Sequence, residues 1–261
     1  MAETTEKPKT KRAPRVDSTL SNGLLILERL ARAKDGMGVT ELARELGLTK
    51  SMAFRLLQSL STLGFVRNSE SKLYSATMKV WQIGQLAISN LNLPAIAAPH
   101  MRVLSQETGE AIYLAVPDGL FVVYIDKIDS TKPIRSWNPI GGSAPIHCVG
   151  TGKALLAENY DTLRDQLRDN LTRHTDRTIT SLKRLDADVA ATRARGYAID
   201  TGEFRDRIFS FGSAIRLPNN EAVAAIGVSV PDVNLTEGRD QEICQLVLKA
   251  AQGASADLAK L

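Results

Sequence analysis

The stretch Thr40–Gly64 constrains the fold more than any other, because it has the pattern of two short helices joined by a tight turn. Apolar residues recur at helical spacing on both sides of Gly47, and glycine readily adopts the left-handed conformation that ends a helix. The hydroxyls of Thr40 and Thr49 can accept the free N–H groups of a first helical turn, so we expect them to cap the two helices. The pattern is typical of a helix-turn-helix, with Thr49–Leu63 as the recognition helix.

The polar face of the recognition helix indicates how such a unit contacts DNA. Short or cationic side chains gather near its start, where they can enter a major groove: Lys50, Ser51, Met52 and Arg55. After this helix, Phe65–Arg67 and Leu73–Ser75 alternate as two short strands around a polar loop, which predicts a winged helix. We expect four further side chains to contact phosphates: Thr40, Thr49, Arg67 and Lys72.

The charge distribution agrees with a DNA-binding first domain. Residues 1–79 carry 14 Lys and Arg against 8 Asp and Glu, a net charge of +6, whereas residues 80–261 carry 19 against 21, a net charge of −2. Binding to phosphates requires positive charge near the recognition helix. Residues 1–15 are basic and interrupted by prolines, so we expect a flexible tail that either follows the DNA backbone or is simply solvated.

Helices are expected on both sides of this unit. Leucines at helical spacing predict a helix from Ser18 to about Ala33 whose leucine face covers the helix-turn-helix, namely Leu20, Leu24, Leu27 and Leu30. From Thr77 to about Asn90 an apolar stripe, with Trp81 beside it, fits either a rigid coupler or a dimer seam. The predicted organisation is a tail (1–15), a winged helix-turn-helix (16–76), a linker helix (77–93) and a second domain (94–261).

The rest of the chain mixes strand and helix patterns, which indicates an α+β domain. We expect a hairpin of 110–116 with 120–128, a short strand at Lys132–Trp137, and a closing pair at 209–217 and 223–230. Helices are expected near residues 97–107, 151–171, 181–195 and 236–260. Antiparallel strands with helices on either side favour a sensing module.

Several strings, in their order and spacing, resemble the IclR family of bacterial transcriptional regulators over residues 16–261. The first domain carries Leu42-Ala43 through Gly47-Leu48, Lys50-Ser51, Phe54–Leu57 and Leu63–Val66, and the second carries Ala144–His147, Gly152–Ala157, Arg195–Asp200 and Ala224–Pro231. The resemblance implies an α+β fold, in which an N-terminal winged helix-turn-helix is joined by a linker helix to a GAF-like effector-binding domain. It also implies homodimers or homotetramers, and small organic acids or aromatic catabolites as effectors.

The pocket positions that this resemblance implies are Ser136 (on the predicted short strand), Gly150, Thr151, Asp200, Ser210 and Ser229. Ser210 stands where family members frequently have cysteine, and Arg207 where they usually have glycine. Independently, residues 150–153 lie at a predicted helix start, where free N–H groups and the helix dipole favour an anion. Arg205, Arg207 and Arg216 are close enough in sequence to add charge, and strand alternation leaves open which side they face.

Other chemistries fit the sequence poorly. Gly152-Lys153 lacks the residues that a phosphate-binding loop requires, because His147 and Ala154 occupy the positions of its glycine and hydroxyl. His147 and Cys148 have no further histidine at ligand spacing, so we expect a structural or pocket-wall role and neither a metal nor another cofactor. No nucleophile–base pair supports an enzyme. No apolar run approaches the ~20 residues of a membrane helix and no secretory signal is present, so a cytoplasmic protein without a membrane partner is expected.

Together these patterns predict a ligand-responsive regulator of a catabolic operon. It would bind a double-stranded DNA operator, and a small organic or aromatic acid would control this binding by favouring one arrangement of a dimer. The alternative is an architectural DNA-binding protein whose second domain only oligomerises.

Overall fold

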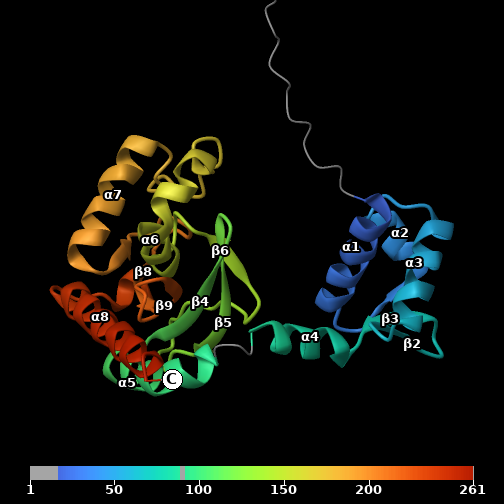
Figure 1. Ribbon diagram of the computed structural model, residues 1–261, viewed down its shortest axis with the longest axis horizontal. Helices are drawn as coiled ribbons and strands as arrows, with labels where there is room; N and C mark the ends of the chain where they lie inside the picture. The colour runs from blue at the N-terminus through green and yellow to red at the C-terminus, as the bar shows by residue number, and fades with distance from the viewer. Residues whose placement is uncertain (1–16, 89–91, 261) are drawn as a thin grey trace, which may run out of the picture. The chain divides into compact units, whose positions relative to one another are not determined.

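The computed structural model describes residues 17–88 and 92–260, so the predicted basic tail lies outside the described residues. The chain divides into two compact units, Met1–Leu91 and Asn92–Leu261 (Figure 1). Each unit has a hydrophobic core of its own. Within the described ranges, no helix has both the length and the apolar composition that crossing a bilayer requires.

The first unit combines helices with a small antiparallel sheet of order β1-β3-β2. Its elements are α1 (Ser18–Arg32), β1 (Met37–Gly38), α2 (Val39–Glu45), α3 (Lys50–Thr62), β2 (Val66–Asn68), β3 (Leu73–Ala76) and α4 (Met78–Ile88). The core packs side chains of all three leading helices against the sheet, including Ile26, Leu30, Leu42, Leu57 and Val66. This is the winged helix-turn-helix expected from the sequence, with β1 as an additional strand.

Capping residues fix the ends of the helix-turn-helix. The Thr49 hydroxyl accepts the backbone N–H three residues later at 3.2 Å, as predicted, and Gly47 has a φ of +65°. The predicted capping role of Thr40 is wrong, because α2 begins at Val39 and its N-cap is Gly38. The pairing of β1 with β3 holds Gly38 in an extended conformation, so the helix starts immediately after it and Thr40 lies within the first turn.

The leucine face predicted for α1 is only partly buried. Ile26 and Leu30 are buried, whereas Leu20 is 64% and Leu24 52% exposed. The core-facing row instead includes Gly23, where an added Cβ would lie 3.9 Å from the side chain of α3 beneath it. Because Gly23, Ile26 and Leu30 lie on the side of α1 that faces the core, Leu20 and Leu24 lie on a row that faces solvent.

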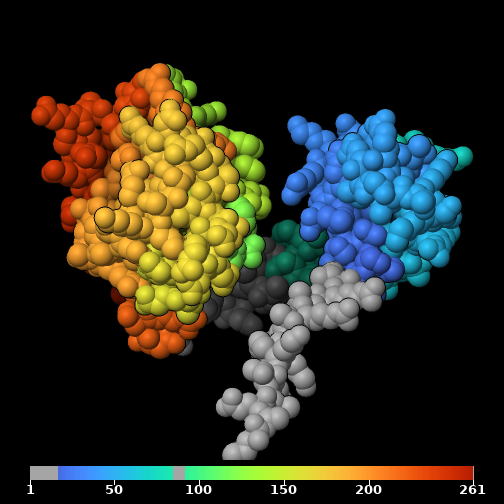
Figure 2. All heavy atoms as spheres, turned by 90° about the horizontal axis from the view of Figure 1, so that it is seen from above, coloured from blue at the N-terminus to red at the C-terminus, as the bar shows by residue number. Residues whose placement is uncertain are grey.

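The second unit contains a six-stranded antiparallel sheet of order β6-β5-β4-β9-β8-β7 (Figure 1). Helices α5 and α8 pack on one face of this sheet and α6 with α7 on the other. In Figure 2 the segment from the end of α6 through α7, yellow to orange, covers the face of this unit that is turned to the viewer. The elements are α5 (Leu93–Thr108), β4 (Ala111–Asp118), β5 (Phe121–Ile128), β6 (Ser143–Pro145), α6 (Gly150–Leu167), α7 (Leu182–Arg195), β7 (Ala198–Asp200), β8 (Ile208–Arg216), β9 (Ala222–Pro231), η1 (Asp232–Asn234) and α8 (Arg239–Leu258).

The segment Lys132–Trp137 is an irregular loop, so the predicted strand there is wrong. β6 occupies the place beside β5 that this strand would have needed, with Ser143 opposite Val123. Pro133 lacks an N–H group and cannot donate to a ladder. Ser136, which we expected on this strand, therefore lies on the loop.

Candidate functional site

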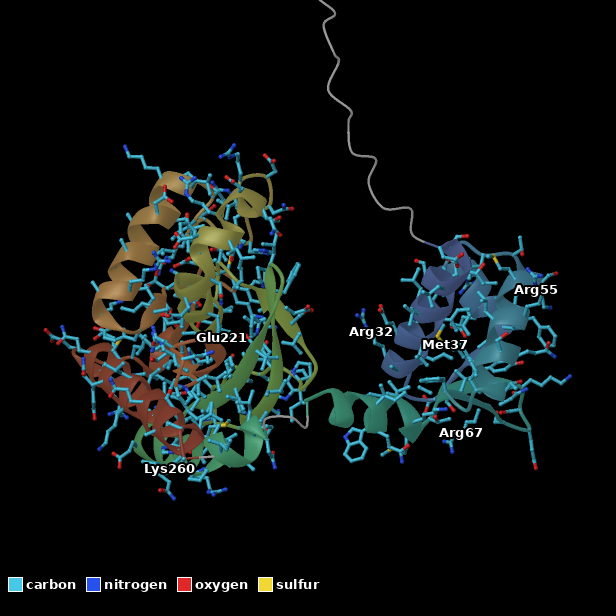
Figure 3. All side chains as sticks on the ribbon, viewed as in Figure 1. Arg32, Met37, Arg55, Arg67, Glu221 and Lys260 are labelled. Carbon is cyan, nitrogen blue, oxygen red and sulfur yellow. The ribbon has the colours of Figure 1, made fainter. Side chains whose placement is uncertain are left out.

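The exposed side of α3 is the first candidate site. Lys50, Ser51 and Arg55 are exposed, and Figure 3 shows Arg55 on the side of α3 away from α1. Met52 differs from the other predicted groove residues, because it is half-buried and packs against the core of the first unit. Its Sδ lies 3.9 Å from the side-chain amide of Asn22 on α1. The exposed surface of α3 therefore carries two cations near its start, Lys50 and Arg55, which are five residues apart.

The residues predicted to contact phosphates all lie on the surface of the first unit. Thr40 and Thr49 are exposed at the starts of α2 and α3. Arg67 is exposed on β2 (Figure 3), and its Nε donates to the Ser75 hydroxyl of β3 at 3.2 Å, which holds the guanidinium along the wing. Lys72 is exposed at the tip of the β2–β3 hairpin with a φ of +61°. These groups are free to approach a polyanion.

The second candidate site is a cavity between the sheet of the second unit and the start of α6. It has about 420 Å³ of space between atoms, part of which is open to solvent. Five of the six predicted effector positions line it: Ser136, Thr151, Asp200, Ser210 and Ser229. The sixth, Gly150, lies immediately behind the wall, and its N–H donates to the Ser210 hydroxyl oxygen at 2.8 Å.

Asp200 is the most strongly hydrogen-bonded of the cavity side chains. It ends β7, is 2% exposed, and its Oδ1 accepts the backbone N–H groups of Gly202 at 2.9 Å and Glu203 at 2.6 Å. Its Oδ2 accepts the Ser210 hydroxyl at 2.6 Å. Because Ser210 also accepts the N–H of Gly150, two hydrogen bonds connect the carboxyl to the first residue of α6.

The same carboxyl is electrostatically unusual. Burial raises the pKa of Asp200 to about 7, against the opposing effect of the hydrogen bonds from Ser210 and from the backbone of Glu203. The group therefore changes charge near neutral pH. When protonated it can donate a hydrogen bond into the cavity, and when ionised it can only accept one.

Glycines allow α6 to begin directly against the sheet. A Cβ added to Gly150 would lie 2.7 Å from the carbonyl carbon of Phe211, and one added to Gly212 would collide with the carbonyl group of Gly150. Gly227, which is opposite Gly212 in the β8–β9 ladder, has the Thr151 side chain above it. This close approach brings Thr151 into the cavity wall.

Aromatic side chains form part of the remaining wall, beside the aliphatic Val149, Ile208 and Val228. Tyr113 and Tyr124 pack with ring centroids 4.9 Å apart, and Phe204 and Phe211 add two further aromatic rings. The Tyr113 hydroxyl oxygen accepts the N–H of Asn138, which ties the loop between β5 and β6 to the cavity. These aromatic residues could not be predicted as site residues from the sequence, because their proximity depends on the strand register.

Ser136 and Arg205 complete the wall on the loop side. Ser136 is 5% exposed, and within the described residues its hydroxyl has no hydrogen-bond partner. A buried hydroxyl without a partner is costly, and a ligand in the cavity can supply one. Arg205 is exposed, and its Nη1 donates to the carbonyl oxygen of Trp137 at 3.0 Å. The cavity thus combines an aromatic body with polar groups suited to a small polar ligand.

Comparison with known proteins identifies the family. The family profile described as "Bacterial transcriptional regulator IclR C-terminal" matches residues 85–256, and the one described as "IclR helix-turn-helix domain" matches residues 19–70. The chain belongs to the IclR family of bacterial transcriptional regulators. The resemblance stated from the sequence, and the α+β fold with a winged helix-turn-helix and a GAF-like domain that it implied, are confirmed.

Individual relatives agree with this identification. The chain is 34% identical over 253 residues to the transcriptional repressor IclR of Escherichia coli K12, with 94% of this chain and 92% of that protein covered. It is 27% identical to Thermotoga maritima IclR, whose crystal structure matches with a TM-score of 0.74 over 92% of this chain and 98% of that one. An IclR homologue from Microbacterium hydrocarbonoxydans, complexed with 4-hydroxybenzoate, has the same fold, with a TM-score of 0.81 at 22% identity over 92% and 99% of the two chains.

In this IclR-family chain, Lys153 does not serve the anion site that was predicted at the helix start. Its side chain is buried and does not line the cavity at Asp200. The ammonium group donates to Glu203 Oε1 at 2.6 Å and to the carbonyl oxygen of Ile199 at 2.7 Å, and it lies 3.2 Å from Asp188 Oδ2. A cation whose partners are two carboxylates and a carbonyl oxygen of the same region is not available to a ligand in the cavity at Asp200.

Two of the three arginines considered from the sequence also lie elsewhere. Arg207 pairs with Asp232 at 2.9 Å, and Arg216 pairs with Glu158 at 2.6 Å. Of the three, Arg205 alone lines the cavity. A bound anion would therefore find one arginine at the cavity and no lysine in the described wall.

Proposed function

We propose that this IclR-family chain binds a double-stranded DNA operator, and that a small organic or aromatic acid held in the cavity at Asp200 controls this binding in the service of a catabolic operon. The observation that carries the proposal is the cavity, in which a wall of aromatic and aliphatic side chains ends in buried hydroxyls and a carboxyl that changes charge near neutral pH. A domain that served only for oligomerisation would not need such a site.

The DNA contacts follow from the exposure of the first unit. α3 enters the major groove, where the cations at its start contact base edges, and the wing and the helix starts contact phosphates. The groove residues are Lys50, Ser51, Met52 and Arg55, and the phosphate contacts are Thr40, Thr49, Arg67 and Lys72. Met52 contributes mainly by supporting α3, because its side chain is half-buried.

The acid is held by neutral donors rather than by a lysine. Its carboxylate accepts hydrogen bonds from the hydroxyls of Ser136, Thr151 and Ser229, close to the positive end of the α6 dipole at Gly150. A second polar group on the ligand meets Asp200 and Ser210. The relative from Microbacterium hydrocarbonoxydans that was crystallised with 4-hydroxybenzoate makes hydroxylated aromatic acids the first compounds to try.

Exposed apolar side chains of the first unit support assembly into a homodimer, with a homotetramer as the larger alternative. Leu20 and Leu24 on α1 are more than half exposed, as is Trp81 on α4, and Ile83 is 46% exposed. Apolar side chains of this size gathered on two helices favour burial against a second copy. Two copies would also match the symmetry of a palindromic operator.

A two-part experiment tests the proposal on the full chain. Selection from random-sequence duplexes should give a palindromic site, and Arg55→Ala should relax base choice at one position at a cost of ~1–3 kcal/mol. The exposed Lys183→Ala on α7 is the matched loss of a cation and should leave binding unchanged.

A thermal-shift screen against small carboxylates and aromatic acids should then find a ligand that changes the operator footprint. Asp200→Ala should abolish that change while operator binding persists, and the exposed Asp118→Ala should not. If no acid alters melting or footprint, the architectural alternative is correct. If selection yields no preferred site, the DNA part of the proposal fails.

A further inference from the structure

A second cavity in the second unit has no part in the function proposed above. It lies between the end of β6, the β4–β5 turn and the loop that follows α6, and it has about 430 Å³ of empty space. Its wall is apolar on one side and polar at the rim, and consists of Leu120, Phe121, Pro145, His147, Asn170, Thr172 and His174. None of these residues lines the cavity at Asp200.

His147 is the buried polar group of this wall. It is 2% exposed. Within the described residues its Nε2 atom is buried and has no hydrogen-bond partner. Burial lowers the pKa of His147 to about 4, which keeps the ring neutral at physiological pH. A neutral imidazole has one N–H donor and one acceptor nitrogen, so Nε2 has the capacity for one hydrogen bond that no described residue fills.

We propose that this cavity is a second ligand site, which takes a small neutral molecule with a hydroxyl group beside an apolar body. The hydroxyl forms a hydrogen bond with His147 Nε2, and the apolar body packs against Leu120, Phe121 and Pro145. A buried polar atom without a partner is costly, and a water molecule that satisfied it would leave the apolar wall in contact with solvent. A phenol or a comparable alcohol satisfies both parts of the wall at once.

The donor set argues against a metal ion at this place. The ring of His174 is 6.3 Å from that of His147, centroid to centroid, and these are the two imidazoles of the cavity. Among the residues that the structure describes, no group of three or more His, Cys, Asp or Glu side chains is placed to hold a metal. Two histidines fall short of the three or four ligands that zinc normally takes.

Nitrogen NMR of the histidine rings in the full chain tests the inference directly. The chain has three histidines, so the Nε2 resonance of His147 can be assigned by its loss in His147→Phe. Titration with 4-fluorophenol should shift this resonance with an affinity on the order of millimolar, as expected for a ligand of this size. Fluorobenzene, which has the same ring without the hydroxyl, should bind at least about tenfold more weakly and leave Nε2 unshifted.

Variants separate this site from the cavity at Asp200, which can also accept an aromatic ring. Fluorine NMR of the bound probe should show that His147→Phe weakens binding of 4-fluorophenol at this site about tenfold or more. His100→Phe, which removes a histidine paired with Asp257 on α8, should not. The inference would be overturned if the Nε2 resonance of His147 does not shift when 4-fluorophenol is added, or if fluorobenzene shifts it equally. The comparison of the two probes needs only the wild-type chain, so it decides the question even if His147→Phe does not fold.

Discussion

Replacing Asp200 by asparagine removes the ionisable group of the cavity at Asp200 and keeps the size of the side chain. In the unfolded chain an aspartate ionises near pH 3.9, whereas burial raises the pKa of Asp200 to about 7 in the folded chain. Between these values the unfolded chain has released a proton that the folded chain still holds. The free energy of unfolding therefore falls as pH rises through this interval and stays at its lower value above pH 7.

The size of this effect follows from the interval. About three pH units at 1.36 kcal/mol each give about 4 kcal/mol in total, of which about 2–3 kcal/mol falls between pH 5 and pH 8. Asparagine has no such dependence. Its amide keeps one oxygen for the N–H groups of Gly202 and Glu203, but turns an NH₂ toward Ser210, whose hydroxyl hydrogen loses its acceptor. This loss costs about 1–2 kcal/mol at every pH.

Asp200→Asn should therefore be close to the wild type in stability at pH 5 and more stable by about 2–3 kcal/mol at pH 8. Urea unfolding followed by the fluorescence of Trp137 measures the second unit, in a Trp81→Phe background that leaves one tryptophan. Asp118→Asn, at an exposed carboxylate, is the control. The reasoning is refuted if the effect of Asp200→Asn is the same at both pH values within about 0.5 kcal/mol, or if it has the opposite sign.

Further predictions concern the ligand, the packing and the assembly. A carboxylate ligand beside Asp200 favours the protonated side chain, so calorimetric affinity for 4-hydroxybenzoate should fall above pH 7, approaching tenfold per pH unit, and a flat profile would contradict this. Gly212→Ala places a methyl group against the carbonyl of Gly150 and should lower stability by more than about 2 kcal/mol in thermal unfolding. Gly84→Ala in α4 meets nothing within 4 Å and should instead stabilise by up to about 1 kcal/mol. Leu24→Glu should convert dimers to monomers in analytical ultracentrifugation, and an unchanged sedimentation coefficient would exclude α1 from the interface.

The parts of the fold that depend on neighbouring residues could be predicted from the sequence. Thr49 caps α3 and Gly47 ends the turn because each needs only the few residues around it. Elements fixed by distant partners could not be predicted. β1 has two residues and β6 has three, too few to show an alternating pattern, and each exists because a strand far along the chain offers a free edge. The strand predicted at Lys132–Trp137 is a loop because β6 occupies the edge of β5, and the sequence cannot show this pairing.

The residues of the cavity at Asp200 also differ in whether the sequence could predict them. Its hydroxyl and carboxyl positions could be proposed by resemblance to a family, whereas the aromatic wall depends on register. Tyr113 and Tyr124 meet across the β4–β5 pair, where a bulge between Leu114 and Ala115 shifts the pairing by one residue. Counting alternate residues along either strand cannot reveal this shift. The direction of Lys153 was also beyond the sequence, because its partner Glu203 lies on a turn that only the folded β7 region brings near.

The start of α6 is the point at which a change in the first cavity can affect the rest of the second unit. Gly150 is joined to Asp200 through Ser210, and its backbone lies so close to Phe211 that even a methyl group would not fit between them. Close-packed contacts of this kind do not absorb a displacement, so a ligand that displaces the Asp200 side chain must either break the hydrogen bond to Ser210 or move α6 with it. Because α6 contacts five strands of the sheet and α7, the second outcome repositions a whole layer, and this is a physical basis on which an acid in the cavity can favour one arrangement of the protein over another.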